Sequence, residues 1–131
     1  MRGVRYLSPD WIDAAGRALA ADDRLGTALA GVTLTVEQEV TGGPDGPVTW
    51  HLAIADGKVA LGAGPAPGAD LRFGTDYPTA ARVAAGELAA QRAFVEGRLR
   101  VGGDLSLLIA HQRPLAAVHD ALAPVRAETT Y

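Results

Sequence analysis

The sequence predicts an α+β fold in which a mostly antiparallel five-stranded sheet has one face covered by about five helices. Five segments alternate apolar and polar residues, which is typical of strands with one buried face. Ser8-Pro9 and Asp104 are helix-start signals, and apolar residues follow each of them at helical spacing. Because the alternation gives each strand one apolar face, we expect helices to cover that face and water the other.

The N-terminal part of the chain predicts one helix and one strand. Ser8 caps the helix with Pro9 in its first turn, and Asp22-Asp23 marks its end. Its apolar residues at helical spacing are Trp11, Ile12, Ala15, Ala18 and Leu19. The strand that follows places Val32, Leu34 and Val36 on one face and Thr33, Thr35 and Glu37 on the other.

Three more strands follow at short intervals. A turn-forming loop over residues 41–47 leads to a strand with Val48, Trp50, Leu52 and Ile54 on one face. Asp56-Gly57 is a strong two-residue hairpin signal, so the strand with Val59 and Leu61 returns alongside. A loop rich in glycine and proline over residues 62–68 precedes the fourth strand, which carries Leu71 and Phe73.

Residues 91–105 join a helix, a strand and a second helix through very short connections. Gly97 favours a left-handed turn that ends a short helix over residues 88–96. The fifth strand, with Leu99 and Val101 on one face, runs to Gly102, and Asp104 caps the next helix. The other helices that we expect cover residues 77–85, 105–112 and 114–122, with Pro114 separating the last two.

Length and composition indicate one domain over residues 1–131 and exclude several functions. The net charge is −3 and the chain has no basic block, so we expect no nucleic-acid partner. No cysteine, signal peptide or membrane-spanning apolar run is present in the sequence, and we expect a cytoplasmic protein. Lys58 is the only lysine among many arginines, which is typical of a GC-rich bacterial genome.

Residues suited to catalysis or metal binding are few. We expect His51, His111 and His119 to lie on the surface, because none has the one-turn spacing of a metal site. Asp22-Asp23 fits a solvated helix end, and Gly102-Gly103-Asp104 fits a strand-to-helix turn rather than a phosphate cradle. The sequence therefore predicts no catalytic residue, no metal and no cofactor. Arg98 and Arg100 are expected on the open sheet face, solvated or in contact with lipid headgroups or a partner.

Residues 91–107 resemble the signature of the sterol carrier protein 2-like lipid-binding domains, Q-x-A-F-x-x-G-[KR]-[LI]-[KR]-[VI]-x-G-D-x-x-L. The matching positions are Gln91, Ala93, Phe94, Gly97, Arg98, Leu99, Arg100, Val101, Gly103, Asp104 and Leu107. Upstream, residues 50–58 are similar to the hairpin of that family, residues 69–73 to its A-D-x-x-[FLI] strand, and residues 86–88 to its helix break. The resemblance covers roughly residues 32–112. It implies the same α+β fold, with a hydrophobic tunnel between sheet and helices.

The resemblance implies a carrier that binds a fatty acid, an acyl-CoA or a sterol-like molecule, with at most transient membrane contact. Periodicity alone does not distinguish a tunnel from a filled core. The residues expected to line the tunnel are Trp50, Leu52, Ile54, Leu71, Phe73, Leu88, Phe94, Leu99, Val101, Leu105, Leu108, Ile109, Val118 and Leu122. Two alternatives stay open: a small cyclase- or isomerase-type enzyme using the same cavity, and an accessory module that docks on a partner enzyme. The ending Thr129-Thr130-Tyr131 does not support a peroxisomal address.

Overall fold

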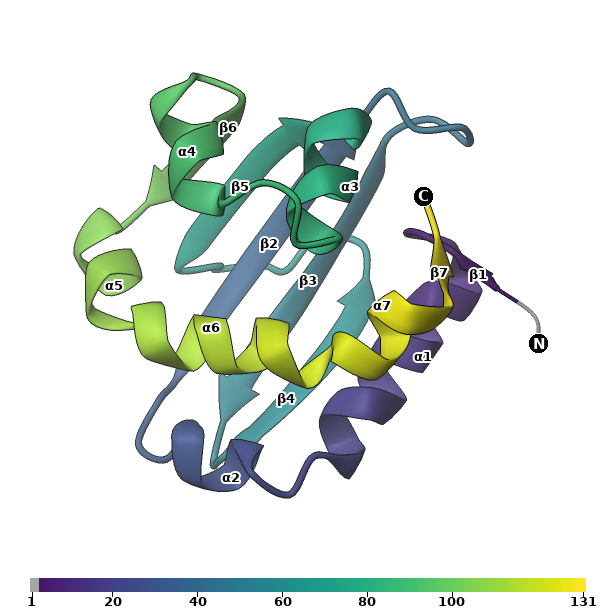
Figure 1. The fold of residues 1–131 in the computed structure, drawn as a ribbon. Coiled ribbons are helices and arrows are strands. Elements are labelled where there is room, and N and C mark those ends of the chain that lie inside the picture. The colour runs from purple at the N-terminus through teal and green to yellow at the C-terminus, as the bar shows by residue number, and fades with distance from the viewer. Residues whose placement is uncertain (1–2) are drawn as a thin grey trace.

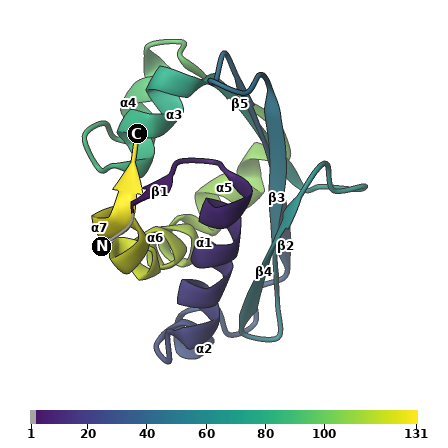
Figure 2. The ribbon, with the colours of Figure 1, turned by 90° about the vertical axis from the view of Figure 1, so that its right-hand side faces the viewer.

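A five-stranded sheet with all helices on one side forms the structure, a computed structural model that describes residues 3–131 (Figures 1 and 2). The strands of this sheet are β2 (Leu34–Thr41), β3 (Val48–Ala55), β4 (Lys58–Ala63), β5 (Leu71–Asp76) and β6 (Leu99–Gly103). Two short strands, β1 (Val4–Arg5) and β7 (Thr129–Thr130), pair with each other in parallel outside the main sheet. The predicted α+β class and five-stranded sheet are thus confirmed.

The order of the main sheet is β4-β3-β2-β5-β6. The pairs β4–β3, β3–β2 and β5–β6 are antiparallel, as expected, whereas β2 and β5 run parallel. The sheet is therefore mixed. This parallel pair arises because the chain completes the β2-β3-β4 meander at one side of β2 and must cross back to the other side before β5 begins.

The loop over residues 64–70 makes that crossing on the face of the sheet opposite the helices. The Ala66 amide donates to Glu37 Oε1 at 3.0 Å, and Glu37 points away from the helices. Asp70 Oδ2 then accepts a hydrogen bond from the Thr35 amide at 2.9 Å. This face also holds an ion pair between Arg72 and Glu37, with 3.7 Å from Nε to Oε2. It is the polar face that the alternation predicts.

The other face of the sheet is apolar, and the residues with common parity all lie on it. Seven of the ten residues predicted for this face are buried: Val32, Leu34, Val36, Trp50, Leu52, Ile54 and Leu71. The remaining three, Phe73, Leu99 and Val101, are only half-buried. These three lie on β5 and β6, so the sheet is less completely covered on that side.

Within the described residues, seven helices lie on the apolar side of the sheet (Figure 2). They are α1 (Pro9–Ala21), α2 (Leu25–Ala28), α3 (Tyr77–Ala84), α4 (Ala90–Val95), α5 (Leu105–Ala110), α6 (Gln112–Ala121) and α7 (Ala123–Glu128). The predicted caps are present: Ser8 Oγ accepts from the Trp11 amide at 3.2 Å, and Asp104 Oδ1 accepts from the Ser106 amide at 3.0 Å. The sequence predicts five of these helices, and α2 and α7 are additional.

The helices divide the sheet into two halves. Helix α1 packs on β4, and its buried residues Trp11, Ala15 and Leu19 fill the space beneath it. Helices α3, α4 and α5 lie over the β2, β5 and β6 half, and α6 runs across the sheet toward α1 and α7 (Figure 1). Helix α5 has the sequence Leu-Ser-Leu-Leu-Ile-Ala, yet no residue of it is buried. Leu107 and Leu108 of α5 are half-buried against the core while Ile109 is exposed, so this apolar helix covers the sheet only partly.

Candidate functional site

A cavity of about 730 Å³ lies between the helices and four of the five strands of the main sheet. Its floor is the apolar face of four strands, because β2, β3, β5 and β6 each contribute two residues. The floor residues are Val36, Gln38, Trp50, Leu52, Phe73, Thr75, Leu99 and Val101. Six of these eight are apolar, so the floor is a hydrophobic surface with polar side chains at two points.

The helical walls of the cavity combine small residues with large exposed ones. Helix α3 presents Ala80 and Ala84, whose short side chains leave the space open. Phe94 on α4 and Ile109 on α5 line the cavity while remaining 48% and 71% exposed. Large apolar side chains that are both cavity-lining and exposed mark the place where the cavity meets water. The cavity therefore reaches the surface at α4 and α5, and also beside Tyr131, which lines the cavity and is 44% exposed.

A cluster of aromatic side chains, most of them from the two ends of the chain, also borders the cavity. The Tyr6 ring lies 5.1 Å from Trp11, 5.6 Å from Tyr77 and 5.3 Å from Tyr131, and Trp11 lies 5.6 Å from Trp50. Tyr6, Trp11, Trp50 and Tyr131 all line the cavity. Burial raises the pKa of the Tyr6 phenol, with the neighbouring Tyr131 and Tyr77 adding to the effect. The Tyr6 phenol is thus a neutral hydrogen-bonding group over the working pH range.

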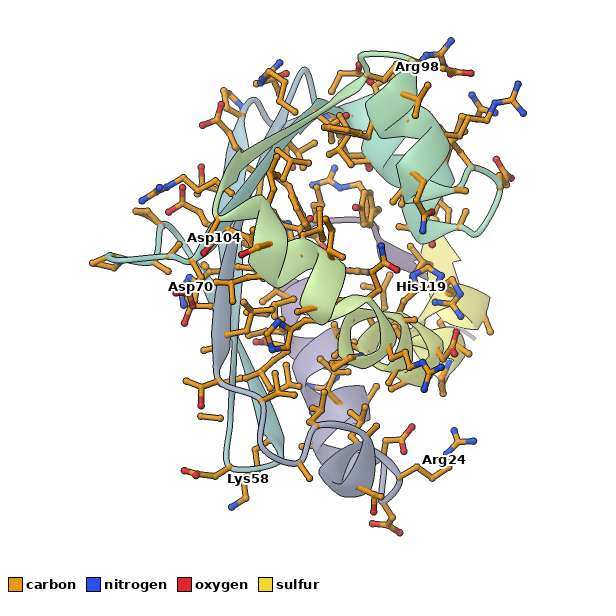
Figure 3. All side chains as sticks on the ribbon, turned by 90° about the vertical axis from the view of Figure 1, so that its left-hand side faces the viewer. Arg24, Lys58, Asp70, Arg98, Asp104 and His119 are labelled. Atoms are coloured by element: carbon orange, nitrogen blue, oxygen red, sulfur yellow. The ribbon has the colours of Figure 1, made fainter. Side chains whose placement is uncertain are left out.

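His119 and Arg126 place polar groups on the helical wall. Both line the cavity, and Arg126 Nη1 donates to the His119 carbonyl oxygen at 2.6 Å. Figure 3 shows His119 within the helical layer, well away from the sheet. Burial lowers the pKa of the His119 imidazole, and the nearby Arg126 charge lowers it further against an opposing effect of Asp120. The neutral imidazole is therefore favoured at neutral pH.

The sequence predicts that the three histidines lie on the surface, but all three are half-buried, and His119 also lines the cavity. It is half-buried in the cavity wall, because it lies one helical turn from both Leu115 and Leu122 and so belongs to the inward stripe of α6. This spacing is the feature of the sequence that indicates an inward position for His119. His51 and His111 are also half-buried, with their Nδ1 atoms 2.8 Å from the carbonyl oxygens of Gly64 and Leu107. Neither of these two lines the cavity.

The structure brings most of the predicted ligand-contacting residues together. Eleven of the fourteen lie in the cavity wall: Trp50, Leu52, Phe73, Leu88, Phe94, Leu99, Val101, Leu108, Ile109, Val118 and Leu122. Ile54 and Leu71 are fully buried in the core outside the cavity. Leu105 also lies outside its wall and is 46% exposed. Leu105 begins the first turn of α5, where the helix starts away from the cavity.

A second, polar cleft of about 450 Å³ adjoins the cavity and shares Leu88 and Ala89 with it. Its remaining residues are charged: Arg82, Glu87, Arg92, Glu96 and Arg98. Arg92 donates to Glu96 at 2.9 Å and holds the pKa of that carboxyl below its usual value. Arg98 lies 3.4 Å from the same carboxylate, so it is paired rather than free on the open sheet face.

Residues suited to metal binding do not converge in the described part of the chain. No group of three or more His, Cys, Asp or Glu side chains in residues 3–131 is placed to hold a metal ion. Asp70 and Asp104, which lie close together at the sheet in Figure 3, have structural contacts instead: the Asp104 amide donates to the Asp70 carbonyl at 3.2 Å. Among residues 3–131, no helix has the length and apolar character needed to cross a membrane.

Comparison with known proteins gives one family. The sequence profile of the SCP-2 sterol transfer family matches residues 15–116. No curated protein has a significant sequence match to this chain. Solved structures with the same fold include that of sterol carrier protein 2, with a TM-score of 0.72 and 19% identity over 88% of this chain and 95% of that one.

Two further solved structures share the fold. A Thermus thermophilus protein described as a possible sterol carrier protein has a TM-score of 0.68 and 21% identity, over 95% of this chain and 92% of that one. Palmitated SCP2L2 from Aedes aegypti has a TM-score of 0.61 and 18% identity, over 86% of this chain and 95% of that one. At these identities the similarity establishes the fold.

Proposed function

The chain belongs to the SCP-2 sterol transfer family, and from this premise we propose that it is a carrier that binds a lipid or sterol-like molecule non-covalently in its cavity. Lipid or sterol binding is the general property of this family. The observation that supports the proposal is the cavity itself, about 730 Å³ with a largely apolar floor. That volume falls in the range of ~300–1,000 Å³ that is usual for small-molecule sites.

Apolar burial supplies the binding free energy in this proposal. Each methylene transferred from water into the cavity contributes ~0.8 kcal/mol, so a long acyl chain contributes several kcal/mol even after the cost of ordering it. The same figure limits selectivity, since one methylene more or less changes affinity only a few-fold. We therefore propose a broad range of acyl chain lengths. No bond is made or broken.

We further propose that the ligand enters at α4 and α5. Phe94, Val95 and Ile109 line the cavity and are also among the most exposed large apolar residues of the protein. An apolar rim of this kind lets a ligand move from a lipid surface into the cavity without full exposure to water. Membrane contact in this proposal is transient and confined to that rim.

The experiment that tests the proposal combines native mass spectrometry of the purified protein with displacement of a fluorescent fatty acid. We expect a co-purified lipid or a saturable, displaceable probe. Ala84→Phe fills the cavity wall at a position beside the helix break, and we expect it to reduce probe binding at least tenfold. Ala110→Phe is the matched control, because Ala110 is exposed on α5 and does not line the cavity. Equal probe binding by both variants, or none by the natural sequence, would contradict the proposal.

A further inference from the structure

Strand β6 is one edge of the main sheet, and its outer side pairs with no other strand in residues 3–131. The Asp104 amide donates to the carbonyl of Asp70, the residue before β5. Because the direction of the backbone groups alternates along an antiparallel strand, even-numbered residues of β6 bond to β5 and odd-numbered residues point outward. The outward-pointing residues are Leu99, Val101 and Gly103. An unpaired strand edge of this kind is a template for pairing with another strand.

The sequence of β6 is complementary to itself when two copies pair antiparallel. With Val101 on the twofold axis, Leu99 of one copy lies opposite Gly103 of the other. Arg100 of one copy then lies opposite Gly102 of the other, so each long side chain meets a glycine. The fold of one copy does not require glycine at position 102, since a Cβ there would have no atom nearer than 3.9 Å. Glycine at such a position fits the close approach of another strand.

The same register brings opposite charges together at both ends of the strand. Arg98 of one copy lies directly opposite Asp104 of the other, and the symmetry repeats this pair. Figure 3 looks onto the β6 edge and labels these two residues at its two ends. Arg98 also pairs with Glu96 of its own copy, yet its side chain stays 49% exposed. The guanidinium of Arg100 lies over Gly74 of its own β5, so the two copies of Arg100 do not meet.

The helices on either side of β6 carry apolar side chains that one copy leaves uncovered. Helix α4 precedes β6 and exposes Phe94 and Val95, whereas α5 follows β6 and exposes Leu105 and Ile109. Antiparallel pairing places α4 of one copy beside α5 of the other, on the same side of the joined sheet. These residues are four of the five large apolar side chains that residues 3–131 expose, so the pairing covers most of that surface.

We propose that a second copy of this chain pairs with β6 through its own β6, joining the two sheets and covering the cavity mouth at α4 and α5. Phe94 and Ile109 line the cavity of their own copy, so α5 of the second copy completes the wall there. The opening beside Tyr131 lies at the other side of the molecule, where Figure 1 marks the C-terminus. Ligand exchange through α4 and α5 then requires the copies to separate, a consequence that rests on the carrier function.

Sedimentation equilibrium of the full chain without ligand, over a range of protein concentrations, tests the pairing. We expect a reversible monomer–dimer equilibrium for the natural sequence. Arg98→Glu or Asp104→Lys alone places like charges opposite each other at both ends of β6, so each should raise the dimer Kd about tenfold or more. An equimolar mixture of the two variants restores both opposite-charge pairs and should regain the dimer. Arg24→Glu is the matched control, because it makes the same charge change beside α2, away from β6.

Leu105→Glu is a second variant that should keep the fold, because an acidic residue is favourable in the first turn of α5. Leu105 is exposed and lies outside the cavity wall. This variant should weaken the dimer and speed the exchange of a bound fluorescent fatty acid, while saturating binding of that probe is unchanged.

The outcomes separate the pairing from the carrier function. A monomer at every concentration overturns the pairing and leaves the β6 edge to a lipid surface or another protein. A mixture that stays monomeric, although both variants unfold cooperatively on heating, overturns it as well. If the dimer forms as expected but the fluorescent fatty acid never binds, the pairing stands and the carrier function is wrong.

Discussion

Gly103 ends β6 at a point where no side chain fits. Its φ is +95°, a conformation that favours glycine, and a Cβ there would lie 2.2 Å from the Asp70 carbonyl oxygen. That carbonyl accepts a hydrogen bond from the Asp104 amide, and the Asp70 side chain accepts one from the Thr35 amide. Two of the segments that resemble the carrier family, residues 69–73 and 91–107, therefore meet in space at the junction of β2, β5 and α5.

Gly103→Ala should destabilise the protein by about 2–6 kcal/mol, the sum expected for a strained backbone and an overpacked contact. Gly102→Ala is the matched control, because the nearest atoms to its added Cβ are 3.9 Å away and its φ is not in the left-handed region. Chemical denaturation of both variants measures the difference. Similar losses of stability in the two would show that the close approach to Asp70 is not restrictive.

Phe94→Ala should affect ligand binding more than folding. A fully buried phenylalanine costs ~3–5 kcal/mol when truncated, but Phe94 is 48% exposed, so we expect a loss of stability below ~1.5 kcal/mol. Because the ring lines the cavity, affinity for a fluorescent fatty acid should fall several-fold. Leu105→Ala is the control, since Leu105 is similarly exposed but lies outside the cavity wall. A large loss of stability with unchanged affinity would place Phe94 in the core instead.

At the scale of elements, the strands were predictable because their period is two and one face is buried. The Asp56-Gly57 hairpin is confirmed, with φ of +54° and +75° at the two turn residues, as that turn requires. Strands β1 and β7 could not be predicted, because each has two residues and therefore no period. Helix α2 has four residues and was missed for the same reason.

The apolar part of the candidate site was predictable from the same periodicity, but its polar part was not. Gln38 continues the parity of Val36 and Val40, and a polar residue at an inward position reads as a break in the pattern. His119 follows the spacing of the α6 stripe, but surface exposure is the more usual state of a histidine. Which inward position faces a cavity and which faces core depends on helix placement, which no local pattern specifies.

Helix α6 should make stability depend on pH through His119. Burial lowers the pKa of this imidazole below its unfolded value of 6.5, so the unfolded state binds more protons in the interval between the two values. Stability is therefore full above pH 6.5 and falls as the pH decreases through the folded-state pKa. His119→Gln should remove part of this loss, and thermal unfolding between pH 7.5 and 5 measures it.

The pH range over which His119 affects stability lies above the range in which the helix-capping residues Asp76 and Asp104 affect it. Hydrogen bonds from Thr79 lower the pKa of Asp76 below 3.8, and those from Ser106 do the same for Asp104, so their contributions are lost only at still lower pH. Parallel curves for the natural sequence and His119→Gln down to pH 5 would mean that the folded protein accommodates the charged imidazole without cost.

At the scale of the whole molecule, helices pack closely on one half of the sheet, whereas over the other half they leave a cavity. The half under α1 is a close-packed core, whereas the β5–β6 half leaves Phe73, Leu99 and Val101 half-buried beneath a helix with no buried residue. Apolar side chains at inward positions occur in both halves, so the sequence alone does not distinguish them. An unfilled apolar space is costly for the free protein, and a ligand that fills it recovers that free energy.

Ligand binding should therefore raise the unfolding temperature, and the rise should depend little on salt. A ligand that binds only the folded state stabilises it by RT ln(1 + [L]/Kd), which is ~2.7 kcal/mol at a hundredfold excess over Kd. Salt at 0.15 M screens charges over ~8 Å but leaves apolar burial nearly unchanged. A melting screen against fatty acids, acyl-CoA and sterols, at low and high salt, measures both effects. If the shift occurred only at low salt, the ligand would be held by charges at the arginine-lined cleft rather than by the cavity floor.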